Sequence, residues 1–344
     1  MTSGRLMPPP NGDPGDAAGV VDAVDRIRQG IAALRGEIAS AVLGQEDVVD
    51  AVLGCLMADG HALLEGVPGT GKTLLVRTVA AATGLDVGRI QFTPDLMPAD
   101  ITGTTVMAEG RGGTRGTVFR PGPIFHQLVL ADEINRASPR TQSALLEAMQ
   151  ERRVTVAGLS HDLPRPFIVL ATQNPIEQEG THRLPEAQID RFLMQINVHP
   201  PEAEVLEGII EKTTAPERPN IRPTIDGVFL EQASLLSRRI LVAPHVNDWI
   251  AALVLGTASG DVGRYAAAPC SPRAAIALRR TAQVAAMTAG RLAVSCSDIR
   301  SVAGNCLRHR LAPGPEGRGH GLTADDLVAK LLEDVPTPAE ECLR

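Results

Sequence analysis

The sequence predicts an α/β fold: a parallel β-sheet with helices on both faces, followed by a smaller, all-helical domain. Short apolar runs alternate with helical patterns up to about residue 199, and this alternation is typical of parallel sheets. Beyond residue 200 the apolar spacing is helical throughout. The 344 residues also exceed the length at which one hydrophobic core usually stops growing. We therefore expect a disordered tail at 1–19, an α/β domain at 20–199 and a helical domain at 200–344.

The composition excludes several classes of protein. Apolar residues make up 44% and charged residues 21%, which favours packed cores over wholesale disorder. Aromatic residues are only 2% and the net charge is -7, and both values disfavour nonspecific binding of nucleic acid. Five cysteines without a C-x-x-C spacing predict neither a disulfide framework nor a zinc site, as expected in a reducing cytoplasm. No apolar run reaches the roughly 18 residues of a membrane span.

The α/β region begins after a proline- and glycine-rich tail that cannot bury enough surface to fold. Apolar residues then recur at spacings of three and four from Val24 to Val42, which predicts an amphipathic helix ending at Gly44. Further apolar patterns predict helices at 48–57, 74–82 and 139–150, and strands at 61–65, 89–92, 128–131, 167–171 and 194–198.

Two stretches interrupt this alternation, and we expect both to be β-hairpins. Residues 101–120 are rich in Gly and Thr, and in 152–166 Val154 and Val156 alternate before a glycine. In the helical region, Ser271 and Pro272 predict a helix start, because the hydroxyl caps free N–H groups and proline needs no acceptor there.

A glycine-rich segment lies between a predicted strand and a predicted helix and matches G-x-x-x-x-G-K-[ST]. Such glycines let successive backbone N–H groups surround a phosphate, and the following helix points its positive end at it. Lys72 supplies a charge for the β- and γ-phosphates, and Thr73 is a ligand for Mg²⁺. The segment predicts a site for ATP and Mg²⁺ formed by Gly66, Val67, Pro68, Gly69, Thr70, Gly71, Lys72, Thr73 and Leu74.

Candidate catalytic residues follow later strands. Asp132 ends an apolar strand, where it can reach Mg²⁺ through water as a second metal residue beside Thr73, and Glu133 can polarise an attacking water. Asn174 closes the next strand with an amide suited to contact the γ-phosphate. Arg191 and Arg273 are candidates because guanidinium groups stabilise the transferring phosphoryl group, in cis or from a neighbouring subunit. Arg273 lies in the first turn of its predicted helix. We expect the N-terminus of the Arg273 helix to face the nucleotide.

From about residue 24 to 338, the chain resembles the MoxR-family AAA+ ATPases. The segments that carry this resemblance, besides the phosphate loop, are VLGQE (42–46), LADEINRA (130–137), QSALLEAMQE (142–151), ATQNPIE (171–177), LPEAQIDRF (184–192), SPR (271–273) and LRHR (307–310). The resemblance implies a nucleotide domain with a helical lid, assembled into a ring, expected to be a hexamer, with ATP between subunits. It implies that Asn174 is sensor 1, Arg273 sensor 2 and Arg191 the finger acting on a neighbour, with Arg136 and Arg183 as rivals.

The resemblance also implies a chaperone-like motor that hydrolyses ATP to remodel, mature or activate partner proteins. Such motors often work with a von Willebrand factor A domain protein, here a separate chain. The two predicted hairpins fall where this clade carries inserts that commonly face a ring's pore or a partner.

Other functions stay open beside this one. The chain is similar to related clades that act as nucleic-acid motors or as metal-chelatase motor subunits. A scaffold that binds ATP and hardly hydrolyses it is a further hypothesis, which the presence of Glu133 opposes. A small GTPase is disfavoured, because the sequence has no Asn-Lys-x-Asp motif.

Overall fold

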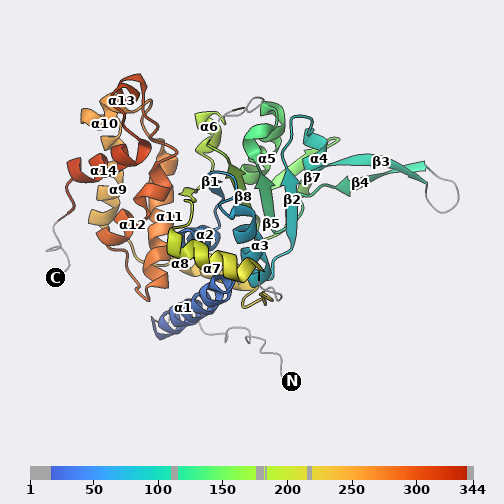
Figure 1. Cartoon of the computed structure of the whole chain (residues 1–344), viewed down its shortest axis with the longest axis horizontal. Helices are drawn as coiled ribbons and strands as arrows, with labels where there is room; N and C mark the ends of the chain where they lie inside the picture. The colour runs from blue at the N-terminus through green and yellow to red at the C-terminus, as the bar shows by residue number, and fades with distance from the viewer. Residues whose placement is uncertain (1–16, 110–114, 176–181, 183, 215–218, 339–344) are drawn as a thin grey trace.

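The computed structural model describes residues 17–109, 115–175, 182, 184–214 and 219–338 (Figure 1). Most of the predicted tail, residues 1–16, lies outside this part of the chain. The last three residues of the predicted tail are instead helical, because helix α1 (Ala17–Ala39) already begins with two alanines, the best helix former.

Five parallel strands form the central sheet in the order β2-β5-β8-β1-β9, which confirms the predicted α/β fold. Ala62 of β1 is paired with Leu170 on one side and with Met194 on the other. The strands are β1 (Ala62–Glu65), β2 (Val87–Gln91), β5 (Leu128–Asp132), β8 (Ile168–Gln173) and β9 (Met194–Asn197).

Helices cover both faces of this sheet. Successive residues of each strand point to opposite faces, so each face has its own apolar core. Leu64 and Leu170 are buried in one core, and Leu63 and Val169 in the other. The first core contains residues of α1, α2 (Glu46–Met57) and α3 (Lys72–Thr83). The second contains residues of α4 (Pro98–Thr102), the short helix η1 (Ile134–Arg136) and α5 (Pro139–Glu151).

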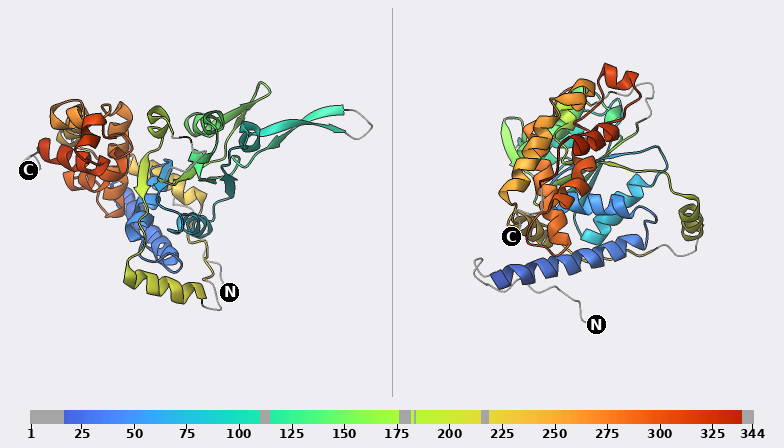
Figure 2. Two further views of the ribbon diagram at one scale, coloured as in Figure 1. Left: turned by 45° about the horizontal axis from the view of Figure 1, so that its top comes forward. Right: turned by 90° about the vertical axis from the view of Figure 1, so that its left-hand side faces the viewer.

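Both predicted hairpins are present, and each forms its own two-stranded sheet. They are β3 (Gly103–Glu109) with β4 (Arg115–Pro121), and β6 (Arg153–Val156) with β7 (Leu159–Asp162). The β3–β4 hairpin projects far from the body of the molecule (Figures 1 and 2). The two hairpins touch where the ring of Phe119 stacks on His161, with 4.0 Å between the ring centroids.

The chain after residue 200 is helical in its described part, apart from isolated bridges. Its helices are α7 (Ala203–Thr214), α8 (Gly227–Ser237), α9 (Pro244–Gly256), α10 (Gly260–Tyr265), α11 (Pro272–Thr288), α12 (Cys296–Leu307), α13 (Pro315–Gly319) and α14 (Ala324–Asp334). Helix α7 is tied to the α/β domain, since Lys212 Nζ donates to the carbonyl of Ser40. Helix α8 packs against α1 and α2, so the separate bundle seen in Figure 1 consists of α9 to α14. None of the described helices combines the length and the apolarity needed to cross a bilayer.

This bundle, the lid, docks on the edge of the sheet where the strands begin. Helix α12 packs against β9, and α11 packs against α1 and α2. The guanidinium of Arg280 on α11 donates to the carbonyl of Ala58, just before β1. The docking surface is continuous with the first core, which contains residues of both the sheet and the lid.

His61 is buried immediately before β1 and is held in one tautomer. Its Nδ1 accepts a hydrogen bond from the Val169 N–H at 3.0 Å, so Nε2 carries the proton and donates to the carbonyl of Met149 at 3.1 Å. Burial lowers the pKa of His61 to about 3, and the nearby Arg152 acts in the same direction. The neutral ring therefore joins β8 to the end of α5.

We predict that His61 makes stability fall as the pH is lowered through 6.5 towards 3. The unfolded chain takes up the proton below pH 6.5 while the folded chain does not, so acid favours unfolding by about 2 kcal/mol between pH 7 and pH 5. Urea unfolding at these two pH values should show a smaller loss in His61→Gln, which keeps one donor and one acceptor. His199→Gln, at an exposed position, is the control and should behave like the unmodified protein. An unchanged pH dependence in His61→Gln would contradict the assignment.

Candidate nucleotide site

The phosphate loop connects β1 to α3, and its glycines are required by geometry. A Cβ on Gly66 would lie 2.4 Å from the carbonyl oxygen of Val198, so only glycine fits there. Gly69 and Gly71 have φ angles of +86° and +82°, in the left-handed region that glycine adopts without strain. A Cβ on either of them would meet nothing within 4 Å, which leaves an open cradle above the loop.

Lys72 and Thr73 begin helix α3 at the floor of this cradle. Lys72 Nζ donates to the carbonyls of Gly66 at 2.6 Å and Val67 at 2.9 Å. Burial lowers the pKa of Lys72, although the carboxylates of Asp132 and Glu133 oppose this shift. Leu74, the residue after Thr73, has a half-exposed side chain.

Asp132 is buried at the carboxyl end of β5 and faces the phosphate loop. Its Oδ1 accepts a hydrogen bond from Thr172 Oγ1 at 2.7 Å. Its Oδ2 lies 3.5 Å from Thr73 Oγ1 and 2.8 Å from Arg89 Nη2, in an ion pair. Three side chains from three strands or helices therefore orient this carboxylate.

Glu133 has a φ angle of +56°, which is unusual for a residue with a side chain. Such backbone strain often occurs at functional sites, where the surrounding structure maintains it. Here the Glu133 N–H donates to Thr172 Oγ1 at 2.9 Å. The carboxylate accepts hydrogen bonds from Gln91 Nε2 at 3.1 Å and from Arg136 Nη1 at 2.7 Å.

Asn174 follows β8, the strand that lies between β1 and β5. Its carbonyl accepts a hydrogen bond from Asn135 Nδ2 at 3.3 Å. Since the strands are parallel, the phosphate loop, both carboxylates and Asn174 gather at the carboxyl edge of the sheet. Ligands of open α/β sheets bind at this edge.

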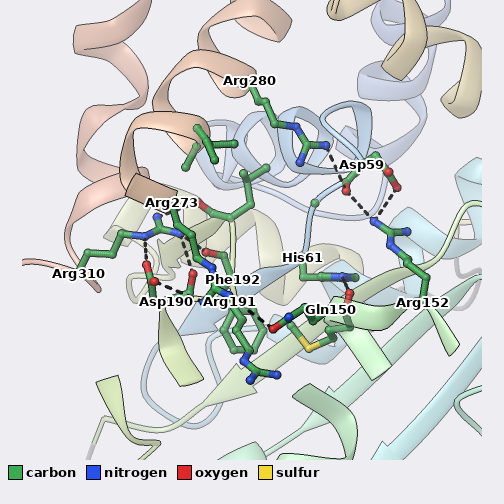
Figure 3. Close-up of a pocket in the computed structure, with 15 residues that line it drawn as sticks. Asp59, His61, Gln150, Arg152, Asp190, Arg191, Phe192, Arg273, Arg280 and Arg310 are labelled. Atoms are coloured by element: carbon green, nitrogen blue, oxygen red, sulfur yellow. Dashed lines mark hydrogen bonds and ion pairs between the residues drawn. The ribbon is translucent and has the colours of Figure 1, made fainter. Parts of the chain in front are cut away.

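Arg191 and Arg273 lie at the opposite edge, where both line a pocket with Gly60 and His61. Figure 3 shows the two arginines in this pocket. Arg191 follows the short helix α6 (Glu186–Ile189), and two residues later Leu193 N–H donates to the carbonyl of His61. Gly60 and Gly66 are six positions apart on an extended stretch of chain, which places the two edges roughly 20 Å apart. The N-terminus of the Arg273 helix therefore does not face the phosphate loop of its own chain, because the lid docks where the strands begin.

Arg191 and Arg273 line a cavity of about 250 Å³ between α11 and the sheet. Its lining includes five arginines and two aspartates, namely Arg152, Arg191, Arg273, Arg280, Arg310, Asp59 and Asp190. Arg191 Nη1 donates to the carbonyl of Leu146 at 2.8 Å, while its Nε has no hydrogen-bond partner among the described residues. Of the rival fingers, Arg136 pairs with Glu133 of its own chain, and Arg183 lies outside the described residues.

Comparison with known proteins identifies the family. Residues 61–194 match the profile of the ATPase family associated with various cellular activities (AAA), and residues 261–331 match the AAA lid domain. The chain is 38% identical over 333 residues to chaperone MoxR1 of Mycobacterium tuberculosis, covering 94% of this chain and 86% of that protein. Protein MoxR of Methylorubrum extorquens is 31% identical over 335 residues, covering 90% of this chain and 96% of MoxR. The chain belongs to the MoxR family of AAA ATPases.

The fold of this MoxR-family ATPase is also similar to a solved structure. The crystal structure of a candidate ATPase from Cytophaga hutchinsonii matches with a TM-score of 0.84 and 34% identity, covering 92% of this chain and 97% of that one. Membership of the family implies ATP binding and hydrolysis, and it confirms the resemblance found in the motifs.

The residues at the carboxyl edge fit ATP with Mg²⁺. Among the described residues no group of three or more His, Cys, Asp and Glu side chains is arranged to hold a metal. Mg²⁺ commonly uses only one or two protein ligands together with phosphate oxygens and waters. Thr73 Oγ1 and Asp132 Oδ2, at 3.5 Å from each other beside the open cradle, match this requirement.

Three side chains of this site were not singled out from the sequence: Arg89, Gln91 and Thr172. Arg89 and Gln91 alternate with buried residues on the edge strand β2 and contact the carboxylates of the next strand. Thr172 lies two residues before Asn174 and contacts Asp132 and Glu133 at once. A polar residue directly after the four apolar residues that begin β8 was the available signal for Thr172.

We predict that Thr172→Val lowers kcat for ATP hydrolysis by about 10- to 100-fold, because small displacements of catalytic groups have costs of this size. The buried Asp132 also loses a hydrogen-bond donor, which should lower the free energy of unfolding by about 1–3 kcal/mol. Steady-state hydrolysis and urea unfolding measure the two effects. Thr172→Ser retains the hydroxyl and should keep most of the activity, so equal losses in both variants would count against this role.

Proposed function

We propose that this MoxR-family ATPase works as a ring-shaped motor that hydrolyses ATP to remodel, mature or activate other proteins. The observation that carries the proposal is the division of its candidate catalytic residues between two edges of one sheet. Lys72, Thr73, Asp132 and Glu133 lie at one edge, and Arg191 lies at the other. An arginine side chain cannot span roughly 20 Å, so Arg191 serves the nucleotide of a neighbouring copy.

Each residue at the carboxyl edge has a role in hydrolysis. Lys72 and the backbone of the loop bind the β- and γ-phosphates, and Thr73 and Asp132 hold Mg²⁺. When bound, Mg²⁺ neutralises charge that develops on the phosphates. Glu133 polarises the attacking water and accepts its proton, while Asn174 orients that water against the γ-phosphate.

The neighbouring copy supplies further positive charge for the transition state, since Arg89 and Arg136 at this edge are paired with Asp132 and Glu133. In our proposal Arg191 and Arg273 of one subunit both face the γ-phosphate held by the next subunit. This pairing requires that each subunit present its amino edge to the carboxyl edge of another. Such head-to-tail contacts close into a ring, here a hexamer.

The target of the motor is a protein in this proposal. The projecting β3–β4 hairpin exposes Met107 at 71% and Val118 at 52% of their surface, and exposed apolar side chains favour protein partners. The net charge of -7 disfavours a nucleic-acid partner. A separate protein with a von Willebrand factor A domain is the expected adaptor.

The described cysteines are free thiols, as expected for a protein that works in the reducing cytoplasm.

We predict that ATP promotes assembly and that three variants lose hydrolysis for different reasons. Lys72→Ala should lose ATP binding, whereas Glu133→Gln should bind ATP and assemble without turnover. Arg191→Ala should bind ATP but show kcat lowered by about 10³-fold, the size of effect known for arginine fingers. Steady-state hydrolysis with light scattering after size exclusion measures both properties, and the assembled mass should be near six times the 36.3 kDa of the chain.

The matched control is Arg318→Ala on α13, an exposed arginine far in sequence from the site. It should assemble and hydrolyse ATP like the unmodified protein. A chain that stays monomeric with ATP yet hydrolyses it, or full activity in Arg191→Ala, would contradict the ring proposal.

A further inference from the structure

The LRHR segment at the end of α12 has no role in the scheme above, although it lies beside Arg191. Arg310 is almost fully buried, with its side chain 3% exposed. Buried arginines are costly unless their five N–H donors find acceptors. The acceptors of the Arg310 guanidinium therefore show to which segment of the chain the lid is attached.

Arg310 binds the segment that carries the proposed finger. Its Nε donates to Asp190 Oδ1 at 2.7 Å, and its Nη2 donates to the carbonyls of Phe192 at 2.6 Å and Asp190 at 3.1 Å. Its Nη1 donates to the carbonyl of Leu193 at 3.3 Å. The backbone acceptors on both sides of Arg191 are thus bound by one lid side chain.

His309 adds a second lid contact to the same segment. Its Nε2 donates to the carbonyl of Phe192 at 3.1 Å. Burial lowers the pKa of His309 well below its usual value, and the charge of Arg310 beside it acts in the same direction. The imidazole therefore stays neutral and does not repel the neighbouring guanidinium.

Asp190 connects this clamp to Arg273. Its Oδ2 accepts a hydrogen bond from Ser271 Oγ at 2.8 Å, the hydroxyl that also caps the first turn of α11. The same oxygen lies 3.5 Å from Arg273 Nη1. Figure 3 shows Arg273 and Arg310 on either side of Asp190, directly beside Arg191. One carboxylate thus joins Arg273 to Arg310, and Arg191 is the residue that follows Asp190 in the chain.

We propose that Arg310 is a positioning residue that, through Asp190, holds Arg191 and Arg273 in the orientation in which they reach the nucleotide of a neighbouring subunit. The inference rests on the proposed function, since it assumes that these arginines act in trans. Arg310 itself touches no nucleotide. Its planar fork binds a carboxylate and three carbonyls of the segment around Arg191, and it also donates to the carbonyl of Cys306 in the lid, which the single ammonium of a lysine cannot do.

The first test is the charge-conserving variant Arg310→Lys in the full chain. We expect kcat to fall by about 10- to 100-fold, as for a displaced catalytic group, while KM for ATP changes less than about twofold. The matched control is Arg308→Lys, two residues earlier, whose side chain pairs with Asp325 inside the lid. This control should retain its kcat, and equal losses in both variants would overturn the proposal.

Mixed rings then separate positioning in trans from a general weakening of the subunit. Arg310→Lys subunits keep an intact phosphate loop, and Glu133→Gln subunits keep intact arginines but cannot turn over ATP. Adding an excess of Glu133→Gln subunits should raise hydrolysis per Arg310→Lys subunit about tenfold or more, because the neighbours now present well-placed arginines. Absence of rescue would mean that Arg310 acts inside its own subunit, and the proposal would be wrong.

A parallel mixture with Arg191→Ala distinguishes this failure from failure of the proposed function. If Arg191→Ala is rescued and Arg310→Lys is not, only the positioning role is overturned. If neither is rescued, the trans arrangement itself is wrong. Should Arg310→Lys fail to fold, as judged by circular dichroism, Asp190→Asn decides the matter in the same mixtures, because it removes the central charge and keeps the shape.

Discussion

The parallel direction of all five strands is the constraint on which the rest of this structure depends. Since every strand points the same way, the sheet has a carboxyl edge and an amino edge with different chemistry. The phosphate loop, Asp132 and Glu133 gather at the first edge, and Arg191 lies at the second. No rotamer change can bring these groups together across roughly 20 Å within one chain. This separation is the reason why we propose that copies of the chain cooperate.

The lid is attached to the amino edge of the sheet by the guanidinium groups of Arg280 and Arg310. Arg280 binds the carbonyl of Ala58 before β1, and Arg310 binds the segment before β9. Burial lowers the pKa of Arg280, although Asp59 opposes the shift, so the attachment depends on backbone acceptors as well as on charge. Apolar packing continuous with the first core completes the interface. Arg273 lies on α11, a helix of the lid, so the docking of the lid also sets the position of Arg273.

The carboxyl edge has a different construction, in which side chains from neighbouring strands restrain two carboxylates. Thr172 on β8 binds Asp132 and the backbone of Glu133, while Arg89 and Gln91 on β2 approach from the other side. These contacts maintain Glu133 in its left-handed conformation despite the strain. Pre-organisation of this kind keeps the proposed base in place before a nucleotide binds.

The sequence by itself determined the fold class, the phosphate loop and the residue types of the carboxyl edge, because their signals lie within a few adjacent residues. A glycine-rich loop between a strand and a helix, or two acids after an apolar strand, needs no long-range contact to be read. Only the tertiary structure decided that Arg273 is separated from its own phosphate loop, and that Thr172, Arg89 and Arg310 support the two edges. These contacts join residues 40, 43 and 120 positions apart, where chain order carries no information about which groups meet. Burial and docking of the lid make that choice.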